Sequence, residues 1–255
     1  MLPASRVFVP SPGNLGYNEK HMTISAVIIA HNEEKLIKRC IESLIYQTKV
    51  PDEIVLIAHN CTDGTAAIAK EYKNIRVVEH STSESGAVFA RMKGFEEAKG
   101  DIVACIDGDS MAFDSWIERI TEPFEDPLVA GVGGFVLFNG FLATIWSLSF
   151  FFFDPLFRPT YRFYFWGSNF ACRKALYSGI GGFSGLIPLK ESIPLNYWAE
   201  DLYLSLALSR VGRVVFRPRA IVFSSSRIFK EDSPREKSRK QNEDRISLFS
   251  RFKTL

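Results

Sequence analysis

Apolar and polar residues alternate in blocks along the first half of the chain, and these blocks predict strands and helices in turn. The continuous apolar run from Ile24 to Ala30 is typical of a strand buried on both faces of a parallel sheet. From Glu33 to Tyr46, apolar residues recur at helical spacing on one face. The same alternation then predicts strands at Ile54 to Ala58, Ile75 to Val78 and Ile102 to Ile106, separated by a helix ending at Tyr72 and a helix that contains Val88, Met92 and Phe95.

This order predicts an α/β fold, a Rossmann-like open and mostly parallel sheet flanked by helices. Thr62 or Asp63 is expected to cap the second helix, and Gly100 to end the third. Ligands of such sheets bind beyond the carboxyl ends of the strands. The polar residues that follow the strands are therefore the first candidates for function.

The pattern loosens after Gly131, where short apolar runs, aromatic residues and paired glycines predict an α+β half built onto the sheet. A helix is predicted from Ala199 to Arg210, followed by a strand from Val214 to Phe216. Residues 227–255 are polar and charged, which indicates a peripheral helix or tail. Residues 1–22 form a tail that lacks the features of a secretory signal.

Composition excludes several classes of protein. Hydrophobic residues make up 46% of the 255, enough for a real core, so the bulk of the chain is expected to fold. The net charge of +2 argues against a nucleic-acid binder. The four cysteines are widely spaced without a CxxC pair, which argues against a disulfide framework or structural zinc and favours a reducing, cytoplasmic setting.

Asp107-Gly108-Asp109 follows directly on the last strand of the first half. Two carboxylates at the carboxyl edge of a sheet suit a hard divalent cation, Mg²⁺ or Mn²⁺, which in turn can hold a diphosphate. The alternative is an ordinary turn, because Asp and Gly are common turn residues. The motif alone leaves both interpretations open.

Four blocks in order resemble the signature of family 2 glycosyltransferases. They are Val27 to Glu34, Asp52 to Thr65, the helix with Gly86, Ala90-Arg91 and Lys93-Gly94, and Gly100 to Asp109, which is similar to the DXD strand of that family. The resemblance implies a GT-A fold and a metal at Asp109 and Asp107. It also implies a nucleotide-sugar site made from Ala30, His31, Glu33, His59, Arg91, Asp107, Gly108 and Asp109.

The second half resembles the acceptor side of the same family. Gly167 to Lys174 and Gly181-Gly182-Phe183 match its acceptor block, and Glu200-Asp201 matches its ED motif. The resemblance assigns Gly167, Ser168 and Glu200 to the acceptor side and makes Asp201 the catalytic base. The plainer interpretation is that both acids cap a helix, and the two roles are compatible.

Two departures from the family pattern limit what it implies. The acid that commonly follows the second strand and reads the nucleotide base is replaced here by Ala58 and His59. His59 is expected either to contact the base or to be an exposed turn residue. Arg91 is expected to face the base or phosphate of the donor, or to be an exposed helix residue. The Gln-x-x-Arg-Trp motif of processive synthases is absent, which favours a transferase that adds a single sugar.

Phenylalanine is concentrated in the second half, with twelve of the 22 between Phe135 and Phe183. The uninterrupted apolar stretch, Phe141 to Phe153, is too short to span a bilayer as a helix. It is expected to be a buried core helix or, by preference, an interfacial segment at the cytoplasmic face of a membrane. Nearby Arg158, Arg162, Arg173 and Lys174 are expected to meet anionic lipid or a lipid phosphate.

The sequence thus predicts a tail at 1–22, a GT-A glycosyltransferase domain at 23–226 and a charged tail at 227–255. Within the domain, 23–110 is the nucleotide-sugar half and 111–226 the acceptor half; we call them the donor half and the acceptor half. The expected activity is inverting, metal-dependent, hexosyltransferase-like transfer from a nucleoside-diphosphate sugar to a hydroxyl or phosphate of an acceptor that is lipid-linked or presented at a membrane. The alternatives are a nucleotidyltransferase and a non-catalytic relative that binds a membrane or partner.

Overall fold

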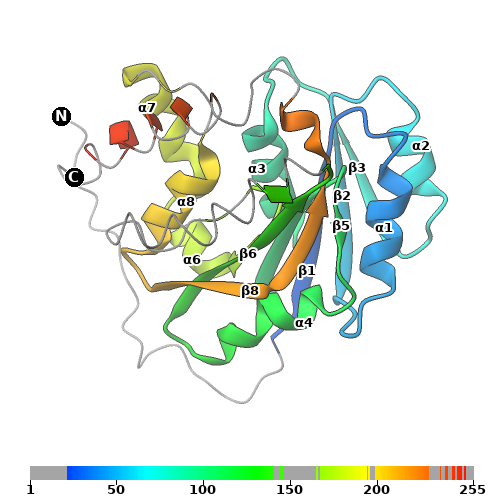
Figure 1. Ribbon diagram of the computed structural model, residues 1–255, viewed down its shortest axis with the longest axis horizontal. Coiled ribbons are helices and arrows are strands. Elements are labelled where there is room, and N and C mark those ends of the chain that lie inside the picture. The colour runs from blue at the N-terminus through cyan, green and yellow to red at the C-terminus, as the bar shows by residue number, and fades with distance from the viewer. Residues whose placement is uncertain are drawn as a thin grey trace.

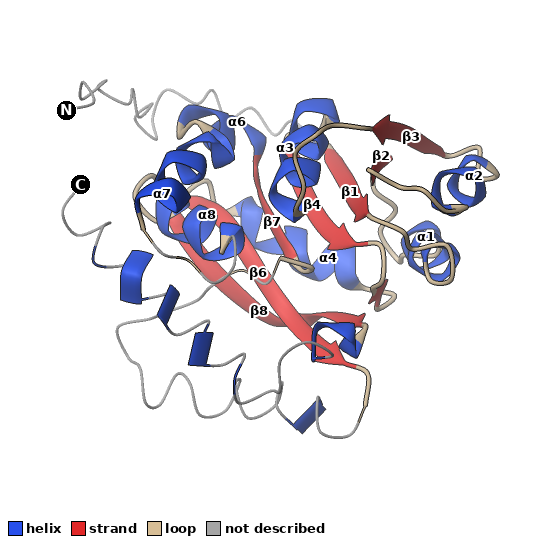
Figure 2. Ribbon diagram, turned by 90° about the horizontal axis from the view of Figure 1, so that it is seen from above, coloured by secondary structure: helices blue, strands red, loops and turns tan. Residues whose placement is uncertain are grey.

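A computed structural model describes residues 22–140, 144–145, 165, 167–193, 195 and 199–229, together with positions 236, 239–240, 243–244, 246–248 and 250 near the C-terminus. Its centre is an eight-stranded sheet in the order β3-β2-β1-β4-β7-β6-β8-β5 (Figures 1 and 2). The predicted open, mostly parallel α/β sheet is confirmed.

The donor half supplies four neighbouring parallel strands of the sheet. Its strands are β1 (Ile24–Ala30), β2 (Glu53–His59), β3 (Ile75–His80) and β4 (Ile102–Asp107), and each pair of neighbours is parallel. All seven residues of β1 are buried. Alternate β1 side chains enter the two cores, one on each face of the sheet, which explains the uninterrupted apolar run.

Helices cover both faces of this sheet. Buried residues of α1 (Ile37–Ile45), α2 (Thr65–Lys70) and α4 (Trp116–Thr121) belong to one core. Those of α3 (Ala87–Glu97) and α8 (Glu200–Leu208) belong to the other. In Figure 1, α1 and α2 lie at the right-hand edge of the molecule and α7 and α8 at the left.

Two helix ends differ in detail from the sequence-based expectation. The third helix ends at Glu97, before Gly100. Gly100 instead meets β1, because a Cβ there would lie 2.6 Å from the backbone nitrogen of Ser25, and its own N–H donates to Ser25 Oγ at 2.7 Å. At the second helix, Asp63 accepts a hydrogen bond from the backbone N–H of Thr65 at 3.0 Å, just ahead of the first turn.

The acceptor half extends the sheet with mixed pairing. β7 (Phe170–Arg173) is antiparallel to β4 and to β6 (Val129–Phe138), whereas β8 (Arg213–Ser224) is parallel to β6 and antiparallel to the short β5 (Met111–Ala112). Its remaining elements are η1 (Glu122–Glu125), α6 (Lys174–Gly179), η2 (Gly182–Gly185), α7 (Leu186–Ser192) and η3 (Ser226–Phe229).

Buried polar side chains hold this half together. Asn169 is fully buried beside the register shift between Gly134 and Phe135, where its Nδ2 donates to the carbonyls of Phe135 and Ala220, both at 2.9 Å. Its Oδ1 accepts from Trp116 Nε1 at 2.8 Å. One amide therefore ties two strands and a helix together at the bulge.

The prediction that Arg173 meets lipid is wrong, whereas the same expectation for the half-buried Lys174 stays a prediction. The Arg173 guanidinium is buried and donates to the carbonyls of Val129, Phe124 and Asp126. Lys174 Nζ donates to the carbonyl of Ala98. Both side chains satisfy backbone carbonyls, which need donors when they are buried. Arg158 and Arg162 lie outside the described residues.

The Phe-rich segment is largely outside the described residues, which include only 144 and 145 of the stretch from Phe141 to Phe153. Within the described part of the chain, no helix is long and apolar enough to cross a membrane. Three phenylalanines of the cluster, Phe165, Phe170 and Phe183, are core residues that are at most 2% exposed.

Candidate active site

The turns that follow β1 and β4 lie side by side at the carboxyl edge of the sheet. A Cβ on Gly108 would lie 2.9 Å from the Cβ of Ala30 and 3.3 Å from Glu33 Cγ, so the lack of a side chain at Gly108 allows the two turns to meet. The Gly108 N–H donates to the carbonyl of Ile29 at 2.8 Å. Ala30 and Gly108 thus shape the site through packing.

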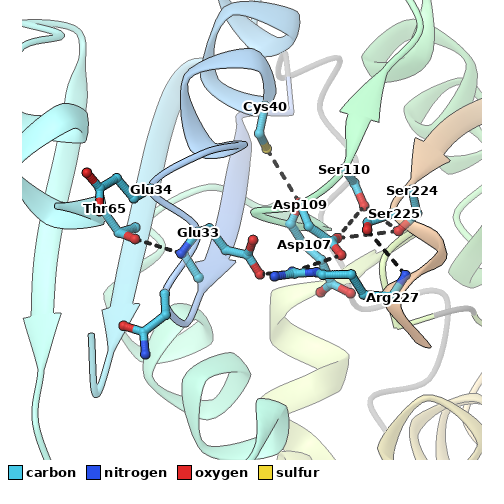
Figure 3. A network of polar contacts seen from close by, with 12 residues as sticks. Glu33, Glu34, Cys40, Thr65, Asp107, Asp109, Ser110, Ser224, Ser225 and Arg227 are labelled. Carbon is cyan, nitrogen blue, oxygen red and sulfur yellow. Dashed lines mark hydrogen bonds and ion pairs between the residues drawn. The ribbon is translucent and has the colours of Figure 1, made fainter. Parts of the chain in front are cut away.

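Asp109 is held from two sides (Figure 3). Its Oδ1 accepts from the hydroxyls of Ser110 at 3.2 Å and Ser224 at 3.4 Å, while its Oδ2 lies 3.3 Å from Nη2 of Arg227. Arg39 donates to its backbone carbonyl at 3.3 Å. Since Ser224 ends β8 and Arg227 lies in η3, the last strand of the sheet closes onto the DXD turn.

Glu33 faces the same point from the β1 turn. Its N–H donates to Thr65 Oγ1 at 2.7 Å, and its Oε1 forms an ion pair with Arg227. Its Oε2 is buried without a hydrogen-bond partner. Burial raises the pKa of Glu33 above its usual value, against the opposing effect of Arg227.

Arg91 joins the donor half to the acceptor half. Its side chain is 2% exposed, its Nη2 lies 2.8 Å from Asp107 Oδ1, and its Nη1 pairs with Oε1 of Glu200. Burial raises the pKa of Asp107 to about 6, although the charge of Arg91 opposes the shift. The interpretation of Arg91 as an exposed helix residue is wrong, and in this structure its guanidinium contacts carboxylates of both motifs.

Asp201 lies in the first turn of α8, next to the Gly167 turn. Its Oδ2 accepts from the N–H of Gly167 at 3.2 Å and its Oδ1 from its neighbour Leu202 at 2.7 Å. Ala199, just before the helix, has φ +50°, an unfavourable conformation for alanine that fixes the direction of the turn.

Gly167 also lies against Arg91, since a Cβ there would be 2.7 Å from Arg91 Nη2. Its neighbour Ser168 is 8% exposed. Of the predicted acceptor-side residues, Gly167 and Glu200 therefore lie against Arg91, and Gly167 also contacts Asp201.

The interpretation of His59 as an exposed turn residue is wrong. His59 is 3% exposed, and its Nδ1 lies 3.1 Å from Nδ1 of His80 on β3. Its Nε2 is buried without a partner. Burial lowers the pKa of His59, and His80 and His31 lower it further, which favours a neutral ring. The exposed His31 contacts the carbonyl of His59 through Nδ1 at 2.9 Å.

The donor set around Asp109 fits a divalent cation that is shared with a ligand. Within the described ranges, no group of three or more His, Cys, Asp or Glu side chains is arranged to hold a metal ion by itself. Mg²⁺ commonly binds one or two protein carboxylates and completes its shell with phosphate oxygens and water. The Arg227 guanidinium between Glu33 and Asp109 shows that this position accepts a cation.

Sequence reasoning missed Arg227, Ser224 and Arg39. Arg227 was assigned to the charged tail, yet it lies among the predicted site residues. A run of three serines and an arginine directly after an apolar strand, at the carboxyl edge of the sheet, is the available signal. This signal is weak, because serine and arginine are also common in exposed loops that have no functional role.

Comparison with known proteins gives a consistent result. A family model described as "Glycosyl transferase family 2" matches residues 25–181. Glycosyltransferase AglE of Haloferax volcanii is 31% identical over 46% of this chain and 40% of its own length. Glucosyl-dolichyl phosphate glucuronosyltransferase of the same organism is 31% identical over 46% of this chain and 39% of its own. The matches thus span less than half of these relatives.

Solved structures share the fold at low sequence identity. The mannosyltransferase PcManGT from Pyrobaculum calidifontis, in complex with GDP-Man and Mn²⁺, has a TM-score of 0.61 and 18% identity over 80% of this chain and 57% of its own. Glucosyl-3-phosphoglycerate synthase from Mycobacterium tuberculosis, in complex with Mn²⁺, UDP and phosphoglyceric acid, has a TM-score of 0.58 and 19% identity. The match covers 91% of this chain and 78% of the synthase chain. The predicted GT-A architecture is therefore confirmed.

Proposed function

The chain belongs to glycosyl transferase family 2, and from that premise we propose that it transfers a sugar from a nucleoside-diphosphate sugar to an acceptor hydroxyl or phosphate with inversion at the anomeric carbon. The observation that carries this proposal is the Arg91 bridge. Arg91 contacts Asp107 of the DXD motif and Glu200 of the ED motif, so the donor and acceptor motifs meet at one end of the sheet.

The catalytic base in this proposal is Asp201. Two backbone N–H groups, those of Gly167 and Leu202, donate to its carboxylate and hold it in place. Asp201 takes the proton of the acceptor hydroxyl as that oxygen attacks the anomeric carbon. The bond from this carbon to the diphosphate oxygen breaks, and the nucleoside diphosphate leaves with the electron pair.

Asp109, helped by Asp107, would hold a divalent cation together with the diphosphate. When bound, such a cation supplies neutralisation of the charge that develops on the leaving diphosphate. The two structural neighbours described above contain Mn²⁺, which supports this cofactor class. Glu33 lies on the other side of Arg227 from Asp109, and His59 and His31 line the neighbouring strand ends, where the nucleotide would lie.

A lipid-linked acceptor is the finer part of the proposal. One relative carries a dolichyl phosphate sugar in its name, and the acceptor half of this chain contains the Phe141 to Phe153 run. A Phe151→Ser/Phe152→Ser variant should partition less onto anionic liposomes than the wild type. Equal partition of the two proteins would count against membrane presentation.

The proposal is tested by a thermal-shift screen of UDP-, GDP-, CDP- and TDP-sugars with and without Mn²⁺. Ligand binding to the native state raises Tm, so one nucleotide is expected to raise it strongly and only with the metal present. Slow hydrolysis of that donor without acceptor would separate an enzyme from a non-catalytic relative. The absence of both a shift and hydrolysis with all four donors would refute the proposed function.

A further inference from the structure

Arg227 lies against Asp109, one of the two predicted metal ligands, and against Glu33 of the predicted nucleotide-sugar site (Figure 3). Its Nη2 pairs with Glu33 and lies 3.3 Å from Asp109 Oδ2. The Arg227 side chain is 43% exposed, whereas those of Glu33 and Asp109 are 10% and 17% exposed. A solvent-facing cation thus covers two enclosed anions.

Three of the four carboxylate oxygens of Asp109 and Glu33 are already engaged. Asp109 Oδ1 accepts from two serine hydroxyls and its Oδ2 faces Arg227. Arg227 also takes Glu33 Oε1, which leaves Glu33 Oε2 buried without a partner. A divalent cation that binds here needs carboxylate lone pairs that now face the Arg227 guanidinium.

We propose that Arg227 is a tethered cation that occupies this position when no metal is present, and that it competes directly with the divalent ion for Asp109 and Glu33. This inference rests on the proposed function, because it assumes that the site takes a metal. Arg227 is then a positioning residue that sets the metal affinity of the site.

Competition follows from charge and geometry. A Mg²⁺ ion lies about 2.0–2.1 Å from the carboxylate oxygen that binds it, and a guanidinium on that same oxygen would be a like charge at close range. Arg227 can leave, since its side chain is partly exposed and comes from a single short turn at the end of β8. After it is displaced, the Arg227 guanidinium remains close enough to donate hydrogen bonds to diphosphate oxygens.

The test is a calorimetric titration of the full chain with Mn²⁺ alone, comparing wild type with three variants. Arg227→Met keeps an unbranched, flexible side chain without the charge, and Arg227→Lys keeps the charge. Arg213→Met is the matched control at the other end of β8, where Arg213 pairs with Asp126 in an exposed salt bridge. Melting curves establish that each variant is folded.

Arg227→Met is expected to bind Mn²⁺ at least about tenfold more tightly, given the repulsion that a unit charge exerts on a divalent ion at short range. The Arg227→Lys and Arg213→Met variants should stay within about threefold of wild type. Equal or weaker binding by Arg227→Met overturns the competition but leaves the proposed function standing. If no protein binds Mn²⁺, the competition is likewise overturned, and the nucleotide screen decides the proposed function separately.

Discussion

The donor half and the acceptor half are held together in different ways. In the donor half, parallel strands pair in unbroken register and apolar side chains fill both faces. In the acceptor half, the register between β6 and β8 shifts twice, and Asn169 and Arg173 satisfy the carbonyls along these strands. Apolar packing tolerates changes in side-chain shape, whereas a buried polar group needs a specific hydrogen-bond partner.

The candidate site lies where these two kinds of structure meet. Asp107 and Asp109 come from the regular half, Glu200, Asp201 and Ser224 come from the irregular one, and Arg227 follows directly after it. Arg91 is the residue that spans the boundary. Perturbing each half separately is therefore the way to test whether the comparison holds.

The largest effect is expected at the boundary itself. Arg91→Met leaves Asp107 and Glu200 next to each other without their shared cation, and breaking a buried ion pair in this way costs about 3–5 kcal/mol. Urea denaturation should show this loss in the free energy of unfolding. Arg91→Lys, which keeps the charge, should recover part of it. Wild-type stability in Arg91→Met would mean that the two halves do not depend on this contact.

The next effect should fall on the acceptor half. Asn169→Ala removes three hydrogen bonds and leaves the buried Trp116 Nε1 without the Asn169 acceptor. A loss of at least about 2–3 kcal/mol is expected, again by urea denaturation. The donor-half control is Asn60→Gly, which suits the φ of +49° and removes two bonds near the surface. If both changes lower the free energy of unfolding by the same amount, buried hydrogen bonds would not distinguish the two halves.

A smaller effect separates close packing in the donor half from open space in the acceptor half. A Cβ on Gly94 of α3 would lie 2.5 Å from Val27 Cγ1 on β1, so Gly94→Ala should cost about 1–3 kcal/mol by overpacking. A Cβ on Gly179 of α6 meets nothing within 4 Å. Gly179→Ala should match wild type or slightly exceed its Tm, because alanine favours helix. A stable Gly94→Ala protein would show that this interface yields.

The smallest effect concerns pH. Because the pKa of His59 is lowered by burial and by His80, the unfolded chain takes up a proton there before the folded chain does. Stability from this residue is present above the unfolded pKa of about 6.5 and is lost as pH falls below it. His59→Asn should reduce the drop in Tm between about pH 7.5 and pH 5.5.

The control for this change is His31→Asn, which removes an exposed imidazole from the same edge of the sheet and leaves the two larger causes of the His59 shift, burial and His80, in place. An unchanged pH dependence in His59→Asn would show that His59 is not the group responsible.

Periodicity predicts the donor half well because each strand and helix there follows one repeating pattern. All four predicted strands and three helices are present, and the resemblance to the family also named Asp107, Asp109 and Asp201 as candidate site residues. Neither the periodicity nor the resemblance could show that Arg173 and Lys174 donate to backbone carbonyls, because nothing local in the sequence identifies those carbonyls. Arg227 was missed for the same reason, since it is distant in sequence from Glu33 and Asp109.

The central claim is that the donor half binds the nucleotide sugar while the acceptor half supplies the base. The most direct measurement is a single-turnover transfer assay, paired with nucleotide-induced Tm shifts in Mn²⁺, on Asp201→Asn and Asp109→Asn. Asp201→Asn should keep the Tm shift and lose about 10²–10⁴-fold in rate, whereas Asp109→Asn should lose the Tm shift as well. Near-normal turnover by Asp201→Asn, or an unchanged Tm shift in Asp109→Asn, would contradict the account.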